Sequence, residues 1–243
     1  MARRRHTLLF DFDGTVALGS GPVLAYARLA AAALGPRDAE TFAATIAASL
    51  LDYPHGRVPG TDAIDGYDLV RIRATEHGID PQVLGRAYLA SREQLATALA
   101  PVHAPQGFAD FLGGLRGEAT LLVATNAPAT RLDAALAELG LDGLFDAVYP
   151  SVGKPAGLVP IVDDWLEHGD VLSIGDIWAN DLAPAQARGA LTALVGPDQD
   201  EADAATPDIR VPSMPELYPF ITAWLAGSPF STQLPTTTER LDS

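Results

Sequence analysis

The sequence has 243 residues, of which 48% are hydrophobic and 19% charged, so it is long and apolar enough to bury a sizeable core. Its formal net charge of −15 argues against a wide electropositive surface, and we expect neither nucleic acid nor membrane as a partner. The absence of cysteine excludes disulfides, thiolate metal sites and cysteine nucleophiles. No apolar run approaches the roughly 20 residues of a membrane span, and the stretch Leu8–Phe10 is too short for a signal peptide, so we expect a soluble, cytoplasmic protein.

The first part of the sequence predicts one strand and then a run of helices. The apolar run His6–Phe10 predicts a buried strand that ends in the polar, turn-forming DFDGT of residues 11–15. Alanine- and leucine-rich segments with helical spacing follow, each ended by glycine or proline. We expect four helices, at residues 22–34, 38–51, 64–77 and 81–99. Four helices in succession indicate a separate helical unit.

Strands and helices alternate in the sequence after Pro101. Strands are expected at residues 119–124, 147–149, 171–174, 191–195 and 208–211. Helices are expected at residues 106–115, 128–139, 158–168, 180–188 and 216–225. This alternation predicts right-handed crossovers and a parallel sheet that is covered on both faces.

The first strand has to join that sheet, so the helical unit is predicted to be an insertion into an α/β domain. We therefore predict a Rossmann-like, three-layer core made of residues 1–16 and 101–226. An all-helical inserted domain takes residues 17–100. The tail, residues 227–243, is rich in Ser, Thr and Pro and is predicted to be disordered.

Polar residues follow four of the predicted strands directly. An aspartate after one strand is commonly a turn or a helix cap, but four such loops at one sheet edge indicate a binding site, because ligands of parallel sheets lie beyond the carboxyl ends of the strands. The candidate residues are Asp11, Asp13, Thr125, Asn126, Lys154, Asp176 and Asp181.

The candidate residues imply a cation and a phosphate ligand. Four carboxylates gathered together would repel one another, whereas Mg²⁺ favours carboxylate oxygens, water and phosphate as ligands. Lys154 is the only lysine of the sequence, the other fifteen basic residues being arginines, and its place in one of these loops suggests a compact positive charge for a phosphate group.

Four short motifs now carry a resemblance to a known family. They are DFDGT at residues 11–15, ATN at 124–126, GKP at 153–155 and GDIWAND at 175–181. In this order, each after a predicted strand, they resemble the motifs of the haloacid dehalogenase (HAD)-like superfamily, over roughly residues 6–195. The helical insertion is similar to the family's helical cap in its first insertion site. The bulky Ile177 and Trp178 depart from the small polar residue that is common after the fourth motif's aspartate.

The resemblance implies the roles of the catalytic residues. Asp11 would attack phosphorus and form an aspartyl-phosphate. Asp13 would protonate the leaving oxygen and then take a proton from the hydrolytic water. Thr125 and Lys154 would bind the transferring phosphoryl group, and Asn126 would shape the loop and lie at the substrate.

The resemblance also implies a magnesium site. Asp11, the backbone carbonyl of Asp13 and the carboxylate of Asp176 would hold the metal directly. Asp181 would act through water or from outside the direct ligands, and it would orient Lys154.

The same resemblance separates the possible activities. Dehalogenases of the family lack an aspartate at the place of Asp13, because a halide leaving group needs no proton, and phosphonatases need a cap lysine that this sequence does not have. We expect magnesium-dependent hydrolysis of a small phosphate monoester, such as a sugar phosphate or phosphoglycolate. A phosphosugar mutase and a non-catalytic member that binds phosphate ligands stay open as alternatives.

Substrate choice should lie with the cap, which in such enzymes closes over the core. His55 and Arg57, in the cap segment of residues 52–59, are either solvated loop residues or contacts for a polar substrate. Arg71 and Arg73 lie two apart on one predicted helix and cannot both face one site, so neither is given a role. The sequence leaves the oligomeric state open.

Overall fold

The computed structural model describes residues 5–51, 61–196 and 206–230. Within them, six parallel strands form one sheet in the order β3-β2-β1-β4-β5-β6. The strands are β1 (Arg5–Phe10), β2 (Ala119–Ala124), β3 (Ala147–Tyr149), β4 (Gly169–Gly175), β5 (Leu191–Val195) and β6 (Ile209–Val211).

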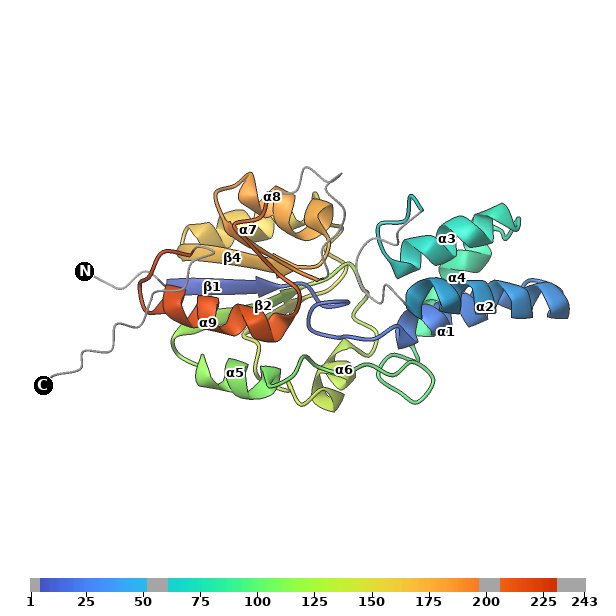
Figure 1. Ribbon diagram of the computed structural model, residues 1–243, viewed down its shortest axis with the longest axis horizontal. Coiled ribbons are helices and arrows are strands. Elements are labelled where there is room, and N and C mark those ends of the chain that lie inside the picture. The colour runs from blue at the N-terminus through green and yellow to red at the C-terminus, as the bar shows by residue number, and fades with distance from the viewer. Residues whose placement is uncertain (1–4, 52–60, 197–205, 231–243) are drawn as a thin grey trace, which may run out of the picture.

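Helices cover both faces of this sheet. Figure 1 shows α7 and α8 on one face and α5, α6 and α9 on the other. These helices are α5 (Phe108–Gly114), α6 (Leu132–Glu138), α7 (Leu158–Leu166), α8 (Ala183–Gln186) and α9 (Met214–Leu225). The predicted α/β core with a parallel, three-layer arrangement is confirmed.

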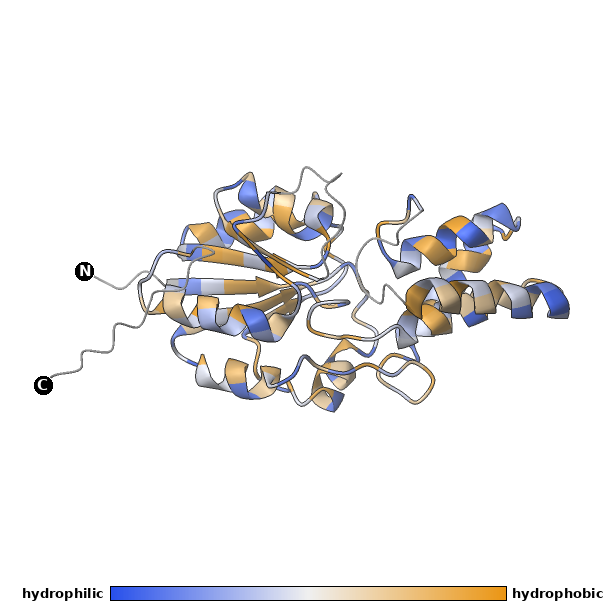
Figure 2. Ribbon diagram, in the orientation of Figure 1, coloured by the Kyte–Doolittle hydropathy of each residue, from blue (hydrophilic) through white to orange (hydrophobic). Residues whose placement is uncertain are grey.

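The alternation of side chains along β1 explains the two faces. Leu8 and Phe10 are completely buried in a cluster with Phe108 of α5, whereas Leu9 packs with Leu158 of α7 in a second cluster. Figure 2 shows the hydrophobic colour concentrated along the strands, which are buried on both faces.

In the part of the inserted unit that the structure describes there are four helices, and we call this unit the cap. They lie beyond the carboxyl ends of the strands in Figure 1. Their apolar faces form a core of their own, which includes Tyr26, Phe42, Ile46 and Leu69. The helices are α1 (Gly21–Ala31), α2 (Pro36–Leu51), α3 (Gly66–Glu76) and α4 (Pro81–Arg92).

The fourth cap helix is shorter than predicted. It ends at Arg92 instead of residue 99, and the chain then turns, with Ala96 in the left-handed region at φ 55° and its N–H donating to the carbonyl of Ala100 at 3.0 Å. Alanine-rich composition favours helix here, but Leu95 is completely buried in the cluster that contains Phe10, and that packing overrides the local propensity.

The ends of the sequence are described only in part. Of the predicted tail, the structure describes residues 227–230, where the ring of Phe230 lies 5.9 Å from that of Trp224 in α9. Residues 231–243 lie outside the described residues, as do His55 and Arg57 of the cap. Among the described residues, no helix is both long and apolar enough to cross a membrane.

Candidate active site

The carboxyl ends of the central strands bring the predicted site residues together. β1 lies between β2 and β4, and the N–H of Asp11 donates to the carbonyl of Ile174 at 2.9 Å, so the first motif begins at the centre of the sheet edge. A pocket of about 220 Å³ opens there between core and cap. It is lined by Asp11, Asp13, Asp65, Tyr67, Tyr88, Thr125, Asn126, Ala127, Lys154, Ile177, Asn180 and Asp181.

Lys154 is held between two carboxylates. Its Nζ donates to Oδ1 of Asp11 at 2.5 Å and to Oδ1 of Asp181 at 2.7 Å, and its side chain is almost completely buried. Burial opposes the ammonium charge, but Asp11 and Asp181 outweigh that effect and raise the pKa of Lys154. The lysine is therefore a fixed positive charge beside Asp11.

Asn126 fixes the loop that carries this lysine. Its Oδ1 accepts the backbone N–H of Lys154 at 2.6 Å, so β2 and β3 present their loops as one unit. Thr125 is buried beside it, and its Oγ1 accepts the N–H of Ala127 at 3.0 Å. That bond uses an acceptor of the hydroxyl and leaves its proton for donation to a ligand in the pocket.

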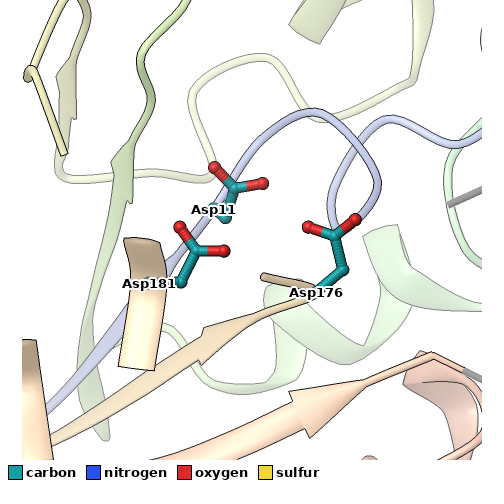
Figure 3. A group of neighbouring side chains, drawn as sticks. All are labelled: Asp11, Asp176 and Asp181. Carbon is teal, nitrogen blue, oxygen red and sulfur yellow. The ribbon is translucent and has the colours of Figure 1, made fainter. Parts of the chain in front are cut away.

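Three carboxylates gather where a metal ion could bind. Oxygen atoms of Asp11, Asp176 and Asp181 lie within 4.8 Å of one another (Figure 3). Asp11 follows β1, Asp176 follows β4, and Asp181 lies in the turn of residues Trp178–Leu182. Burial raises the pKa of Asp11 to about 7, and burial together with the charges of Asp11 and Asp181 raises the pKa of Asp176 well above its usual range. An all-oxygen set of this charge fits a hard divalent cation, which would favour the ionised carboxylates.

Asp13 stands apart from this group. Within the described residues its side chain is not one of the gathered carboxylates, so the predicted metal contact of Asp13 through its backbone carbonyl stays a prediction. Its Oδ1 instead accepts from Nη1 of Arg92 at 2.9 Å and from the hydroxyl of Tyr67 at 3.2 Å. The same Nη1 also donates to the Tyr67 hydroxyl, at 2.8 Å. Asp13 is therefore tied to helices α3 and α4 of the cap.

The loop after β4 has a local form that the sequence does not predict. Residues Trp178–Leu182 make a π-helical turn (η1) where a regular helix was expected to begin at residue 180. This turn brings Oδ2 of Asp181 within 3.0 Å of the N–H of Ile177, while the hydroxyl of Ser173 donates to the Asp181 carbonyl at 2.7 Å. The structure also accommodates the bulky Ile177 and Trp178. Ile177 lines the pocket, and Trp178 is the first residue of the turn and is half-buried.

Gly14 is required by both conformation and space. Its φ is +91°, which side chains rarely adopt, and a Cβ atom at this position would overlap the carboxylate of Asp176. The glycine of the first motif therefore leaves room for one of the candidate metal ligands.

Besides Ala127 and Asn180 of the core, four residues in or beside the pocket were not predicted from the sequence, and these four lie on the cap. They are Asp65, Tyr67, Tyr88 and Arg92. One signal was available: in α4, Leu84, Tyr88 and Arg92 follow one another at intervals of four, which places an arginine on the apolar face. Arg71 and Arg73, given no role, pair with Asp68 and Glu76 on their own helix.

Comparison with known proteins supports a fold assignment. No protein-family model and no curated protein matches the sequence. A HAD phosphatase from Thermococcus onnurineus is similar in structure, with 18% identity, a TM-score of 0.54 and coverage of 91% of this chain and 98% of that one. YfnB from Bacillus subtilis, described as a HAD hydrolase and bound to magnesium, has 20% identity, a TM-score of 0.57 and coverage of 89% and 98%.

The similarity extends to dehalogenases. The 2-haloacid dehalogenase from Pseudomonas syringae pv. Tomato DC3000 has 18% identity, a TM-score of 0.54 and coverage of 90% of this chain and 99% of that one. Phosphatases and dehalogenases thus share this architecture, and the likeness itself does not choose between their activities. This chain has the fold of the haloacid dehalogenase-like hydrolases.

Proposed function

We propose that this protein hydrolyses small phosphate monoesters with Mg²⁺, through an aspartyl-phosphate on Asp11. The observation that carries the proposal is the position of Asp11. Its carboxylate contacts the ammonium group of Lys154 on one side and shares a cluster of candidate metal ligands with Asp176 and Asp181 on the other. Positive charge on both sides of a nucleophile is what phosphoryl transfer needs, because the transferred group is anionic.

In the first step, a carboxylate oxygen of Asp11 bonds to phosphorus and the bond from phosphorus to the leaving alcohol breaks. Asp13 gives a proton to the departing oxygen. In the second step, Asp13 takes a proton from a water molecule, which attacks phosphorus and releases inorganic phosphate and the free carboxylate of Asp11. Oδ2 of Asp13 forms no hydrogen bond to any other described residue, and Asp13 lines the pocket, so one oxygen is available for both transfers.

Lys154 and Thr125 serve the phosphoryl group in both steps. The lysine is fixed by Asp11 and Asp181, so it neutralises charge without having to be repositioned. The Thr125 hydroxyl has a proton to donate. Mg²⁺, when held by Asp11, Asp176 and the Asp13 carbonyl, with Asp181 acting through water, would supply further positive charge to the phosphoryl oxygens.

Asp13 also favours this reaction over dehalogenation, because a halide leaves without a proton whereas an alcohol does not. A phosphosugar mutase would use the same residues and pass the phosphoryl group to a second sugar hydroxyl instead of to water. The product separates the two: inorganic phosphate in one case and an isomeric sugar phosphate in the other.

The test is phosphate release from p-nitrophenyl phosphate and a panel of small phosphate monoesters, with Mg²⁺ or with a chelator. Asp11→Asn is the control, since it keeps the shape of the side chain and removes the nucleophile. Magnesium-dependent release by the wild type that the variant abolishes is expected. A wild type that releases no phosphate from any ester, or an equally active variant, would refute the proposal.

A further inference from the structure

The cap side of the pocket is acidic and aromatic. Asp65 caps the N-terminus of α3, where its Oδ1 accepts the N–H of Asp68 at 2.6 Å. Tyr67 belongs to the first turn of α3, and Tyr88 reaches the pocket from α4. The rings of Tyr67 and Tyr88 meet edge to face, with centroids 5.8 Å apart. The leaving group of a bound ester would face one carboxylate and two aromatic rings.

The two tyrosine hydroxyls differ in what they can offer a ligand. The Tyr67 hydroxyl is engaged, since it donates to Asp13 and accepts from Arg92. The Tyr88 hydroxyl forms no hydrogen bond to any residue in the described part of the chain. A hydroxyl or ammonium group on the ligand could therefore bond with Tyr88.

The described residues of this wall offer no positive charge to a second anion. Among the described residues that line the pocket, Lys154 is the one cation, and it is bound by Asp11 and Asp181. Arg92 has no exposed surface, and its Nη1 is on Asp13. A carboxylate or second phosphate on the leaving group would thus face Asp65 and Asp13, with no cationic partner for it among the described residues.

An ammonium group on the leaving group would be attracted where a second anion is repelled. It would be attracted by the Asp65 carboxylate, and the aromatic rings of Tyr67 and Tyr88 line the same side of the pocket. Burial raises the pKa of Asp65 to about 6, and the charges of Asp68 and Asp13 raise it further.

We infer that the pocket selects phosphate monoesters of amino alcohols, accepts uncharged polyol phosphates less well, and rejects esters whose leaving group carries a second anion. Asp65 is the residue that sets this order. The inference rests on the proposed function and narrows it, since phosphoglycolate, one of the substrates that the family resemblance suggests, is among the esters rejected.

The experiment compares kcat/KM for phosphoethanolamine, glycerol phosphate and phosphoglycolate, with p-nitrophenyl phosphate as a reference. The wild type should prefer phosphoethanolamine to phosphoglycolate by at least about tenfold, the size expected for one charge interaction in a partly solvated pocket. In Asp65→Asn, which keeps a good helix cap, that ratio should shrink by about tenfold. The ammonium group of phosphoethanolamine then loses the attraction of Asp65, and the carboxylate of phosphoglycolate is no longer repelled by it.

Asp80→Asn is the matched control, because Asp80 caps the next helix, α4, by accepting the N–H of Gln82 at 2.7 Å and does not line the pocket. It should leave the ratio unchanged. Phosphoglycolate turnover equal to that of phosphoethanolamine, or an Asp65→Asn ratio equal to that of the wild type, would overturn the inference while the phosphatase activity stands. No phosphate release from any of the four esters would overturn the proposed function and the selectivity with it.

Discussion

Arg92 is a charged residue whose side chain is completely buried. A guanidinium group without exposed surface is costly unless it is paired, and here the partner is Asp13, which follows β1 of the sheet. Tyr67 bridges the two through its hydroxyl. We interpret Arg92 as a positioning residue, which sets where the carboxylate of Asp13 lies relative to the leaving oxygen.

Arg92→Gln should therefore lower kcat/KM most for substrates whose leaving group has to be protonated. An alkyl phosphate, whose leaving alkoxide must be protonated, should lose about a hundredfold in kcat/KM, whereas p-nitrophenyl phosphate, whose leaving phenolate is stable, should lose much less. Arg92→Lys should restore part of the loss. Arg86→Gln, at an exposed position of the same helix, is the control. Equal losses for the two substrates would mean that Arg92 only supports the fold.

A substitution of Gly14 tests whether Asp176 is a metal ligand. Gly14→Ala should abolish magnesium-dependent activity, because the added methyl group displaces the carboxylate of Asp176. Gly78→Ala is a suitable control, since Gly78 also has positive φ, at 73°, but its methyl group would meet open space. Calorimetric titration with Mg²⁺ measures the effect directly. Unchanged magnesium affinity in Gly14→Ala would show that Asp176 is not a ligand.

At the scale of elements, the segment after α4 decides how cap and core are joined. A helix continued to residue 99 would place Leu95 and Leu99 on the same face, because they are four residues apart. In the structure they separate: Leu95 is completely buried in the core cluster, and Leu99 is 59% exposed.

Two alanine substitutions test this separation. Leu95→Ala should lower the free energy of unfolding by about 3 kcal/mol, as expected for a cavity in a core. Leu99→Ala should change it by less than about 0.5 kcal/mol. Urea denaturation of the two variants measures both values. Similar losses for both would favour the continued helix that the sequence alone predicts.

The sequence predicts the strands and the core side of the site, but not the cap side of the site. The sequence locates the strands well, because a short apolar run that leads into a polar loop is seldom anything but a strand when helices alternate with it. Asp11, Lys154 and Asp181 meet as that pattern implies. Asp65 and Tyr88 could not be found, because nothing local shows which part of a helical cap faces the core. Their position in the pocket depends on how the cap packs against the core, which is set by residues far from them in the sequence.

For the whole molecule, the concentration of negative charge at the site links stability to pH and to metal. The pKa of Asp11 rises from 3.8 in the unfolded chain to about 7 in the folded protein, so between these values the folded state binds the extra proton. Stability of the metal-free protein should therefore fall as pH rises from about 4 to 7, by about 1.4 kcal/mol per pH unit for this one group. The loss is complete above pH 7.

Mg²⁺ should reverse this loss. A cation that binds the ionised carboxylates stabilises the folded state more at pH 7.5 than at pH 5, where it competes with protons. Urea denaturation at both pH values, with and without Mg²⁺, tests the expectation. Asp11→Asn should show a weaker dependence on pH. Equal stabilisation by Mg²⁺ at the two pH values would mean that the metal binds elsewhere.

The central claim is that Asp11 carries the phosphoryl group, and the most direct measurement is to trap that intermediate. In Asp13→Asn, p-nitrophenyl phosphate can still phosphorylate Asp11, because its leaving group needs no proton, but hydrolysis lacks its base. Mass spectrometry of the acid-quenched, digested protein should find one phosphoryl group on the peptide that contains Asp11, and none when Asp11→Asn is added. Turnover by the double variant, or a phosphoryl group on another peptide, would contradict the account.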